Sequence, residues 1–269
     1  MVDVTGANAE FWNEPCGTVL ARSIGIEEIT ADALRRYDAT YLGYYPYLIP
    51  LVERAGVTGA AVLEIGLGFG TLGQYIAQRA KVYHGIDIAE EPVGLLQQRL
   101  ALIDPPCHTG VVRQGSALDL PYPAESFDTV VTIGTLHHTG DLARGVSELH
   151  RVLRPGGRAL VMVYNRDSFR RIVRLPRLRV AAMLGRLDGP VDQRLRGMYD
   201  RRSDGRAAPH TDFTSLGEAR RLFGAFADVR IERHNFDDYR IGPLPVRREW
   251  FLGSLDRLLG LDLYITAAK

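Results

Sequence analysis

Short apolar runs alternate with amphipathic stretches along residues 59–164. The apolar runs are rich in β-branched side chains and almost free of charge, which is typical of parallel strands that helices cover on both faces. Between them, apolar residues recur at spacings of three and four, as Leu142, Val146 and Leu149 do, and this period predicts helices. We predict strands at residues 60–66, 81–87, 110–116, 127–134 and 157–164, separated by helices at residues 72–79, 92–102 and 141–153.

The segments on either side of this core carry their own signals. The first 58 residues are rich in tyrosine and are predicted to form helices and loops, and Pro155-Gly156-Gly157 would end the last core helix. Residues 165–206 contain 12 arginines and five aspartates, a local charge of +7. Beyond them, the pattern predicts a helix at 215–223 and strands at 227–235 and 261–269. We expect an α/β fold built from an N-terminal helical cap (1–58), a core (59–164), an Arg-rich helical lid (165–210) and a C-terminal helix and strands that complete the sheet (211–269).

Composition narrows the class of protein. The chain has 269 residues and a formal net charge of +1, so it lacks the basic surplus of a dedicated nucleic-acid-binding domain. Its two cysteines, Cys16 and Cys107, cannot form a disulfide framework or a four-ligand zinc site. The N-terminus lacks the pattern of a signal peptide, and no apolar run approaches the roughly 18 residues of a membrane span. We therefore expect a soluble cytoplasmic protein with no membrane partner.

A glycine-rich turn is the most informative local motif. In VLEIGLGFGTLGQYIA, the residues Gly66-Leu67-Gly68-Phe69-Gly70 join a predicted strand to a predicted helix. Glycines spaced by two let the backbone approach a ligand and open a helix N-terminus towards it, although a merely tight turn would also use them. A dinucleotide-binding turn would carry a third glycine where this chain has Thr71. Asp87 ends the next strand 21 residues after Gly66, where a carboxylate can accept hydrogen bonds from ribose hydroxyls.

The runs EIGLGFG, GIDIAEEPV, QGSALDLPYPAESFDTVV, GTLHHTGDLARGVSELHRVLRPGG and LYITAAK occur in this order. Together they resemble the class I S-adenosylmethionine-dependent methyltransferases, over residues 59–164 and the C-terminal strands. FWNEPCG near the start and VYNRDS after the fifth strand are also similar to a bacterial branch that includes ubiquinone-biosynthesis-like enzymes. The resemblance implies a Rossmann-like sheet of seven strands, mostly parallel with an antiparallel last strand, and a cofactor across the carboxyl ends of the first, second and fourth strands.

The resemblance also implies S-adenosylmethionine as cofactor and S-adenosylhomocysteine as product. The glycine turn would wrap the methionine and ribose portion, and Asp87 would hold the ribose. Many relatives carry an aspartate where this chain has Ser116, so the serine hydroxyl or the backbone alone would hold the adenine amino group. The implied cofactor residues are Glu64, Gly66, Leu67, Gly68, Gly70, Asp87, Ile88, Ser116, Ala117, Ile133, Gly134 and Leu136.

Methyl transfer from a sulfonium is an in-line displacement that depends on positioning and exclusion of water, so we expect neither a catalytic triad nor a metal. His137 and His138 follow the fourth strand, where either could take a proton or serve only structure. Tyr164 and Arg166 end the fifth strand and are candidates for contact with the acceptor. His210 could reach the pocket or lie in a surface loop.

Tyr41, Tyr44 and Tyr45, together with Trp12, could roof the site, since an aromatic face attracts a sulfonium. Their spacing equally fits the buried face of a helix.

We expect a methyltransferase that acts on an O, N or C atom of a small organic metabolite or biosynthetic intermediate. The Arg-rich segment could be a solvated lid, a clamp for a carboxylate or phosphate, or a nucleic-acid contact, although it holds few aromatics for base stacking. Three alternatives stay open: an RNA-modifying methyltransferase, a nicotinamide-dependent oxidoreductase on a similar fold, and a catalytically silent cofactor-binding protein. The sequence leaves the oligomeric state open, including a homodimer.

Overall fold

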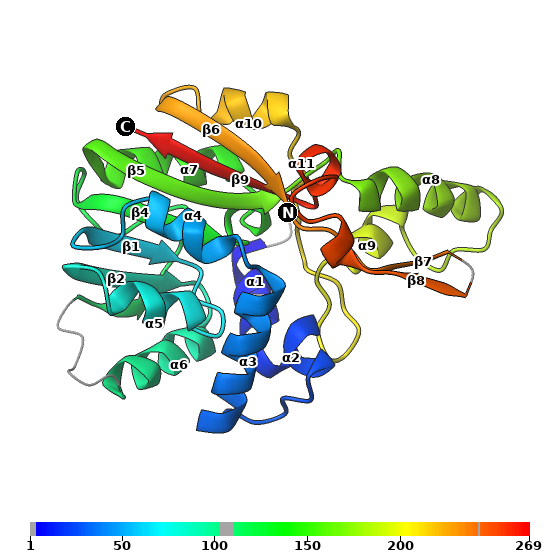
Figure 1. The fold of residues 1–269 in the computed structure, drawn as a ribbon, viewed down its shortest axis with the longest axis horizontal. Helices are drawn as coiled ribbons and strands as arrows, with labels where there is room; N and C mark the ends of the chain where they lie inside the picture. The colour runs from blue at the N-terminus through cyan, green and yellow to red at the C-terminus, as the bar shows by residue number, and fades with distance from the viewer. Residues whose placement is uncertain (1–3, 103–109, 242) are drawn as a thin grey trace.

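The computed structural model describes residues 4–102, 110–241 and 243–269, so Cys107 and the first three residues lie outside the described part. A seven-stranded sheet forms the centre of the molecule, in the order β3-β2-β1-β4-β5-β9-β6 (Figure 1). The first five strands pair in parallel, and β9 pairs antiparallel with both β5 and β6. The predicted Rossmann-like α/β fold is confirmed. The strands of this sheet are β1 (Ala61–Ile65), β2 (Val82–Asp87), β3 (Val112–Gln114), β4 (Phe127–Ile133), β5 (Leu153–Tyr164), β6 (Ala227–His234) and β9 (Asp262–Ala268).

Helices cover both faces of the sheet. Alternate residues of a strand point to opposite faces, and the apolar side chains of β1 divide accordingly. Val62 packs into one buried cluster with α4, α5 and α6, whereas Leu63 packs into another with α7 and α10. These helices are α4 (Leu48–Arg54), α5 (Thr71–Ala77), α6 (Glu90–Ala101), α7 (Leu142–Val152) and α10 (Leu216–Leu222).

The N-terminal helices cross the carboxyl ends of the central strands. The third helix packs Tyr37 against Phe69 and Leu95, in a cluster separate from the two faces of the sheet. This arrangement brings residues from the start of the chain over the glycine turn. The elements are α1 (Val4–Trp12), the 3₁₀ turn η1 (Pro15–Gly17), α2 (Val19–Ser23) and α3 (Ala31–Tyr44).

A second group of elements extends away from the sheet. In Figure 1, α8, α9 and the β7–β8 hairpin all project to the same side of the molecule. Within the described residues no helix is both long and apolar enough to span a bilayer. The remaining elements are the 3₁₀ turn η2 (Leu136–His138), α8 (Phe169–Met183), α9 (Val191–Arg196), β7 (Tyr239–Ile241), β8 (Leu244–Val246), the 3₁₀ turn η3 (Arg248–Trp250) and α11 (Asp256–Leu259).

Two boundaries differ from the sequence-based expectation. The predicted turn at Pro155-Gly156-Gly157 lies inside β5, which begins at Leu153, because the backbone of this stretch pairs with the end of the chain. Gly156 donates to the Lys269 carbonyl at 2.8 Å, and Lys269 donates back to Gly157 at 2.9 Å. The third strand spans three residues rather than seven, because β3 lies at the sheet edge and pairs only with β2.

Candidate functional site

A cavity of about 230 Å³ lies at the carboxyl ends of β1, β2 and β4. Its floor comes from the glycine turn and from the residues that follow β2, β3 and β4. Its roof comes from the N-terminal helices, which contribute Thr5, Asn8 and Trp12 from α1 and Tyr37 and Tyr41 from α3. The cavity therefore joins segments that are far apart in the sequence.

The glycine turn has the backbone shape that a bound ligand requires. Gly66 has a φ of +84°, and a Cβ there would lie 1.8 Å from Oγ1 of Thr135, so the turn packs directly on the residue after β4. Gly68 has a φ of +49°, and a Cβ there would meet no protein atom within 4 Å. Since Gly68 lines the cavity, its open side is available to a ligand.

Asp87 is fixed against this turn. Its Oδ2 accepts the Leu67 N–H at 2.7 Å, and its Oδ1 accepts the Ala89 N–H at 2.9 Å. Burial raises the pKa of the carboxyl, while the backbone donors oppose that shift. The backbone N–H groups of Gly68 and Ile88 also bond to this carboxyl, so four amides fix Asp87 at the end of β2, beside the cavity.

Glu64 places a second carboxyl in the cavity wall. The Tyr83 hydroxyl donates to its Oε2, and the side chain is almost fully buried. Burial raises the pKa of Glu64 to about 8. At neutral pH this carboxyl is therefore mostly protonated, and a cationic ligand beside it would favour its ionised form.

The region after β2 and β3 forms an apolar slot. Ile88, Ala117 and Leu118 line it. The Ser116 Oγ accepts the Leu118 N–H at 3.1 Å, so this hydroxyl is already engaged with its own turn. The slot suits a flat ring system, with backbone groups rather than an acidic side chain at its edge. Together with the open glycine turn and the Asp87 carboxylate, it fits an adenosyl group.

A buried ion pair holds the roof helix α3 on the core. Arg99 of α6 is 3% exposed and donates to both carboxylate oxygens of Asp38, at 2.9 and 3.0 Å. The Thr71 hydroxyl donates to the same carboxylate at 2.6 Å. One residue before Asp38, the ring of Tyr37 stacks on that of Phe69 with centroids 3.7 Å apart. These contacts fix the tyrosines of α3 relative to the glycine turn.

His138 connects the cavity to the Arg-rich segment. Its Nδ1 lies 2.8 Å from the His210 carbonyl, which can only accept, so Nδ1 carries a proton. Its Nε2 lies 3.6 Å from Oδ2 of Asp200, which also accepts a hydrogen bond from the Tyr164 hydroxyl at 3.0 Å. Burial lowers the pKa of His138 and raises that of Asp200. The contacts of both ring nitrogens thus lie in the segment 200–211.

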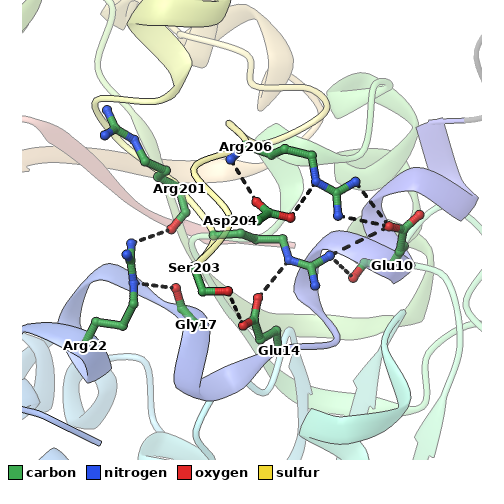
Figure 2. Close-up of polar contacts among 9 residues, drawn as sticks. Glu10, Glu14, Gly17, Arg22, Arg201, Ser203, Asp204 and Arg206 are labelled. Carbon is green, nitrogen blue, oxygen red and sulfur yellow. Dashed lines mark hydrogen bonds and ion pairs between the residues drawn. The ribbon is translucent and has the colours of Figure 1, made fainter. Parts of the chain in front are cut away.

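The N-terminal segment closes the cavity through a set of contacts that we call the clasp. It is formed by Glu10 and Glu14 together with Arg202, Ser203 and Arg206. Figure 2 shows the two glutamates facing this turn of the Arg-rich segment. Arg202 donates to Glu14 at 2.9 Å, Arg206 donates to Glu10 at 3.2 Å, and the Ser203 hydroxyl donates to Glu14. The Ser203 bond lowers the pKa of Glu14.

The cavity brings together most of the residues predicted to bind cofactor. Those that line it are Glu64, Gly66, Leu67, Gly68, Asp87, Ile88, Ser116, Ala117, Ile133 and Gly134, together with His138 and Tyr41. Gly70 and Leu136 do not line it. Gly70 packs instead against Arg99, and Leu136 lies in the core beside Gly145.

Several residues predicted to meet the acceptor lie elsewhere. Tyr44 holds its ring 3.5 Å from the Arg248 guanidinium, and Tyr45 packs beside it. Arg166 forms an ion pair with Glu218, and the His210 side chain lies 3.1 Å from Asp212. None of the four lines the cavity.

His137 and Tyr164 lie behind the cavity wall. They pack against each other with ring centroids 4.2 Å apart. Burial holds the pKa of His137 well below its ordinary value, so this ring is neutral at pH 7.

Part of the roof and the buried acid were missed from sequence. Thr5 and Asn8 line the cavity, and Asn8 donates through Nδ2 to the His138 carbonyl. Asp200 is one of five aspartates in the Arg-rich segment, and no local signature distinguishes it from the others. Across the described ranges no group of three His, Cys, Asp or Glu side chains is arranged to hold a metal ion.

Comparison with known proteins agrees with this geometry. Residues 63–161 match the family model described as a methyltransferase domain. A probable S-adenosylmethionine-dependent methyltransferase of Mycolicibacterium smegmatis is 39% identical over 111 residues, which is 41% of this chain and 40% of that protein. The ubiquinone biosynthesis O-methyltransferase of Pseudomonas paraeruginosa is 33% identical over 119 residues, 43% of this chain and 49% of that one. The chain thus spans less than half the length of these two curated relatives.

The fold has solved counterparts. Magnesium protoporphyrin IX methyltransferase from Synechocystis PCC 6803, solved with bound S-adenosylhomocysteine, aligns with a TM-score of 0.58 at 15% identity, covering 99% of this chain and 100% of that one. At this identity the likeness concerns the fold. The sequence match therefore shows a methyltransferase domain in residues 63–161, and the structural likeness shows that the chain shares the fold of a methyltransferase.

Proposed function

We propose that the protein transfers a methyl group from S-adenosylmethionine to an O, N or C atom of a small organic acceptor. One observation carries this proposal: a single cavity holds an open glycine turn, a fixed carboxylate and an aromatic roof. The glycine turn offers an open backbone surface and Asp87 offers a carboxylate, and both suit an adenosyl group. The aromatic roof forms a second wall of the cavity, opposite them. An acceptor would have to fit between that roof and the cofactor.

The cofactor, when bound, supplies an electrophilic methyl on a sulfonium. Gly66 to Gly68 would follow its methionine and ribose portion, Asp87 would hold the ribose hydroxyls, and Ala117 would face the adenine. The chain's own contribution is to orient and to exclude water. Trp12 and Tyr41 present rings to the cavity, and aromatic faces attract a cation by about 0.5–2 kcal/mol.

We infer a positioning role for His138 rather than that of a base acting directly on the acceptor. Nδ1–H donates to the His210 carbonyl, and Nε2 lies 3.6 Å from Oδ2 of Asp200, so both ring nitrogens face the segment 200–211. Burial lowers the pKa of His138 and raises that of Asp200, because it disfavours the charged form of each group. The imidazole ring thus ties the segment 200–211 to the cavity wall. Tyr164 supports Asp200 and would not meet the acceptor itself.

Calorimetric titration with S-adenosylhomocysteine, run beside NADH at equal concentrations, tests the cofactor. We expect micromolar binding of the first and none of the second. The Asp87→Asn variant should bind S-adenosylhomocysteine more weakly, whereas Asp212→Asn, outside the cavity, should bind normally. Binding of NADH alone would refute the proposal and move the search to hydride transfer.

Acceptor class is tested next, by following S-adenosylhomocysteine release with libraries of phenols, amines and carboxylic acids. Turnover of one of these classes supports a small-molecule acceptor. Turnover of RNA with none of the small molecules would assign the enzyme to RNA modification instead.

A further inference from the structure

The helix α8 turns an apolar stripe towards solvent. Ile172, Pro176, Val180 and Met183 recur at spacings of four, four and three, which places them along one side of the helix. Ile172 and Val180 are each 52% exposed, and Met183 is 78% exposed. No residue of α8 is buried. An amphipathic helix normally faces its apolar side to a core, whereas nothing in the described part of the chain covers this stripe.

Arginines occupy the other sides of the helix. Residues 168–187 contain six arginines and no acidic residue. Arg170 forms an ion pair with Asp237, but no carboxylate of the described chain pairs with Arg174, Arg177 or Arg179, all of which are exposed. Elsewhere arginines are commonly paired, as in the clasp. The charge on α8 is therefore free to meet a negative surface.

The neighbouring hairpin and the 3₁₀ turn η3 that follows it each carry an exposed apolar side chain. Leu244 in β8 is 67% exposed, and Trp250, shortly after it, is 65% exposed. The Phe169 ring at the start of α8 contacts Tyr239 of β7 at 5.0 Å between centroids, so the two elements are joined at their base. Figure 1 shows α8 and the hairpin projecting from the body in the same direction. We call this surface the α8–hairpin face.

We propose that the α8–hairpin face docks on the surface of an anionic lipid bilayer. An exposed apolar stripe on an arginine-rich helix, with an exposed leucine and tryptophan on the segment joined to its base, is the pattern of a helix that lies in the interface plane, its apolar side among the acyl chains and its cations at the phosphates. Such docking needs no spanning segment. The proposal therefore departs from the expectation of no membrane partner, because that expectation rested on the absence of a membrane-spanning segment.

The same features disfavour other occupants. A two-fold contact between copies would bring two arginine-rich faces together without acidic residues to offset them. Single-stranded RNA is gripped by aromatic side chains on which bases stack, whereas the stripe is aliphatic. The α8–hairpin face lies outside the cavity, so the docking proposal does not depend on the proposed methyl transfer, and a negative result for one does not contradict the other.

Co-sedimentation of the full chain with extruded vesicles tests this proposal. We expect binding to phosphatidylcholine vesicles that contain about one third phosphatidylglycerol, little binding to phosphatidylcholine alone, and loss of binding at high salt. The double variant Arg177→Ser/Arg179→Ser should bind about 25-fold more weakly, about fivefold for each arginine. Val180→Asp/Met183→Asp should bind more than tenfold more weakly, because it removes the apolar insertion.

Matched substitutions elsewhere serve as controls. Leu258→Asp changes a side chain that is 64% exposed on α11, and Arg220→Ser removes an exposed arginine of α10. Both should bind vesicles like wild type. Because every substituted side chain is exposed, all variants should keep the wild-type melting temperature and affinity for S-adenosylhomocysteine. A blue shift of tryptophan emission with anionic vesicles, absent in Trp250→Phe, would support insertion of the hairpin.

Four results would overturn the proposal. The first is that wild type does not bind anionic vesicles, and the second is that the α8 variants bind them as well as the controls do. The third is that wild type binds a single-stranded RNA more tightly than vesicles and the arginine variant loses that binding, which would assign the face to RNA. The fourth is that wild type is a dimer that Val180→Asp/Met183→Asp dissociates, which would assign the face to a second copy of the chain.

Discussion

Replacing Asp38 with alanine would remove the carboxylate that holds α3 on the core. The Arg99 guanidinium donates to it at 2.9 and 3.0 Å, and the Thr71 hydroxyl donates to it at 2.6 Å. Alanine leaves a guanidinium that is 3% exposed without its counter-charge. The variant should therefore lose folding free energy as well as the position of Tyr37 and Tyr41 over the cavity.

The size of the effect follows from burial. Removing one partner of a buried ion pair costs about 3–5 kcal/mol. The Asp38 side chain is 30% exposed, so water can reach the gap, and we lower this range to about 2–3 kcal/mol. For a chain of this size, about 1 kcal/mol corresponds to about 2–4 °C, so the melting temperature should fall by about 4–12 °C.

Thermal and urea unfolding of Asp38→Ala, with calorimetric titration of S-adenosylhomocysteine, would measure both effects. Asp32→Ala is the matched control, because Asp32 lies on the same helix and pairs only with exposed arginines. It should cost less than about 1 kcal/mol. Adding Arg99→Met to Asp38→Ala should restore much of the lost stability. Equal stabilities of Asp38→Ala and Asp32→Ala would refute this account of how α3 is held.

Three further predictions concern the cavity. Asp87→Asn should weaken S-adenosylhomocysteine binding by about tenfold or more, since a hydrogen bond to a charged acceptor is worth about 1.5–3 kcal/mol, and calorimetry at constant pH would measure it. The pKa of Glu64 is raised to about 8 in the folded protein, above its value in the unfolded chain. The free energy of unfolding that this carboxyl contributes is therefore fully present below its unfolded-state pKa and is lost as the pH rises through 8. Urea unfolding should therefore show a steeper loss of stability from pH 6 to 9 in wild type than in Glu64→Gln. Over the same pH range, affinity for the cationic S-adenosylmethionine should rise in wild type only. Parallel pH profiles of wild type and Glu64→Gln would contradict both expectations. Asp200→Asn should release the segment 200–211 from His138 and speed trypsin cleavage at Arg201 and Arg202, whereas Asp188→Asn, at an exposed carboxylate, should leave the rate unchanged.

The core was predictable because helices cover the sheet on both faces. Burial on both sides leaves continuous apolar runs, and the strand predicted at 127–134 differs from β4 by one residue. The turn predicted at Pro155 was wrong because the local rule ignores pairing with Lys269, more than 100 residues later. The β7–β8 hairpin was not predicted because its strands are short and lack an alternating apolar pattern, and Pro245 within β8 argues against a strand, although Gly242-Pro243 is a turn signal.

The residues of the cavity were likewise predictable only in part. Gly66, Gly68 and Asp87 could be predicted because the glycine turn and the end of β2 lie close together in the sequence and also form one wall of the cavity. The contacts of His138 with Asn8 and Asp200 join positions 130 and 62 residues apart, and no periodicity encodes them. For α8 we predicted a helical lid but not that an apolar side of the helix would face solvent.

The clasp has a consequence for the timing of folding and of ligand exchange. Glu14 and Arg202 close a loop of 188 residues, and the entropy of such a closure favours forming it only after the sheet has assembled. Contacts that form last and lie at the surface are also the first to open, without global unfolding. The chain would then pass through a stage with a finished glycine turn and with the α1 part of the roof not yet in place. Fluctuation back to that stage, rather than diffusion through a fixed channel, would set how often the cavity exchanges its contents.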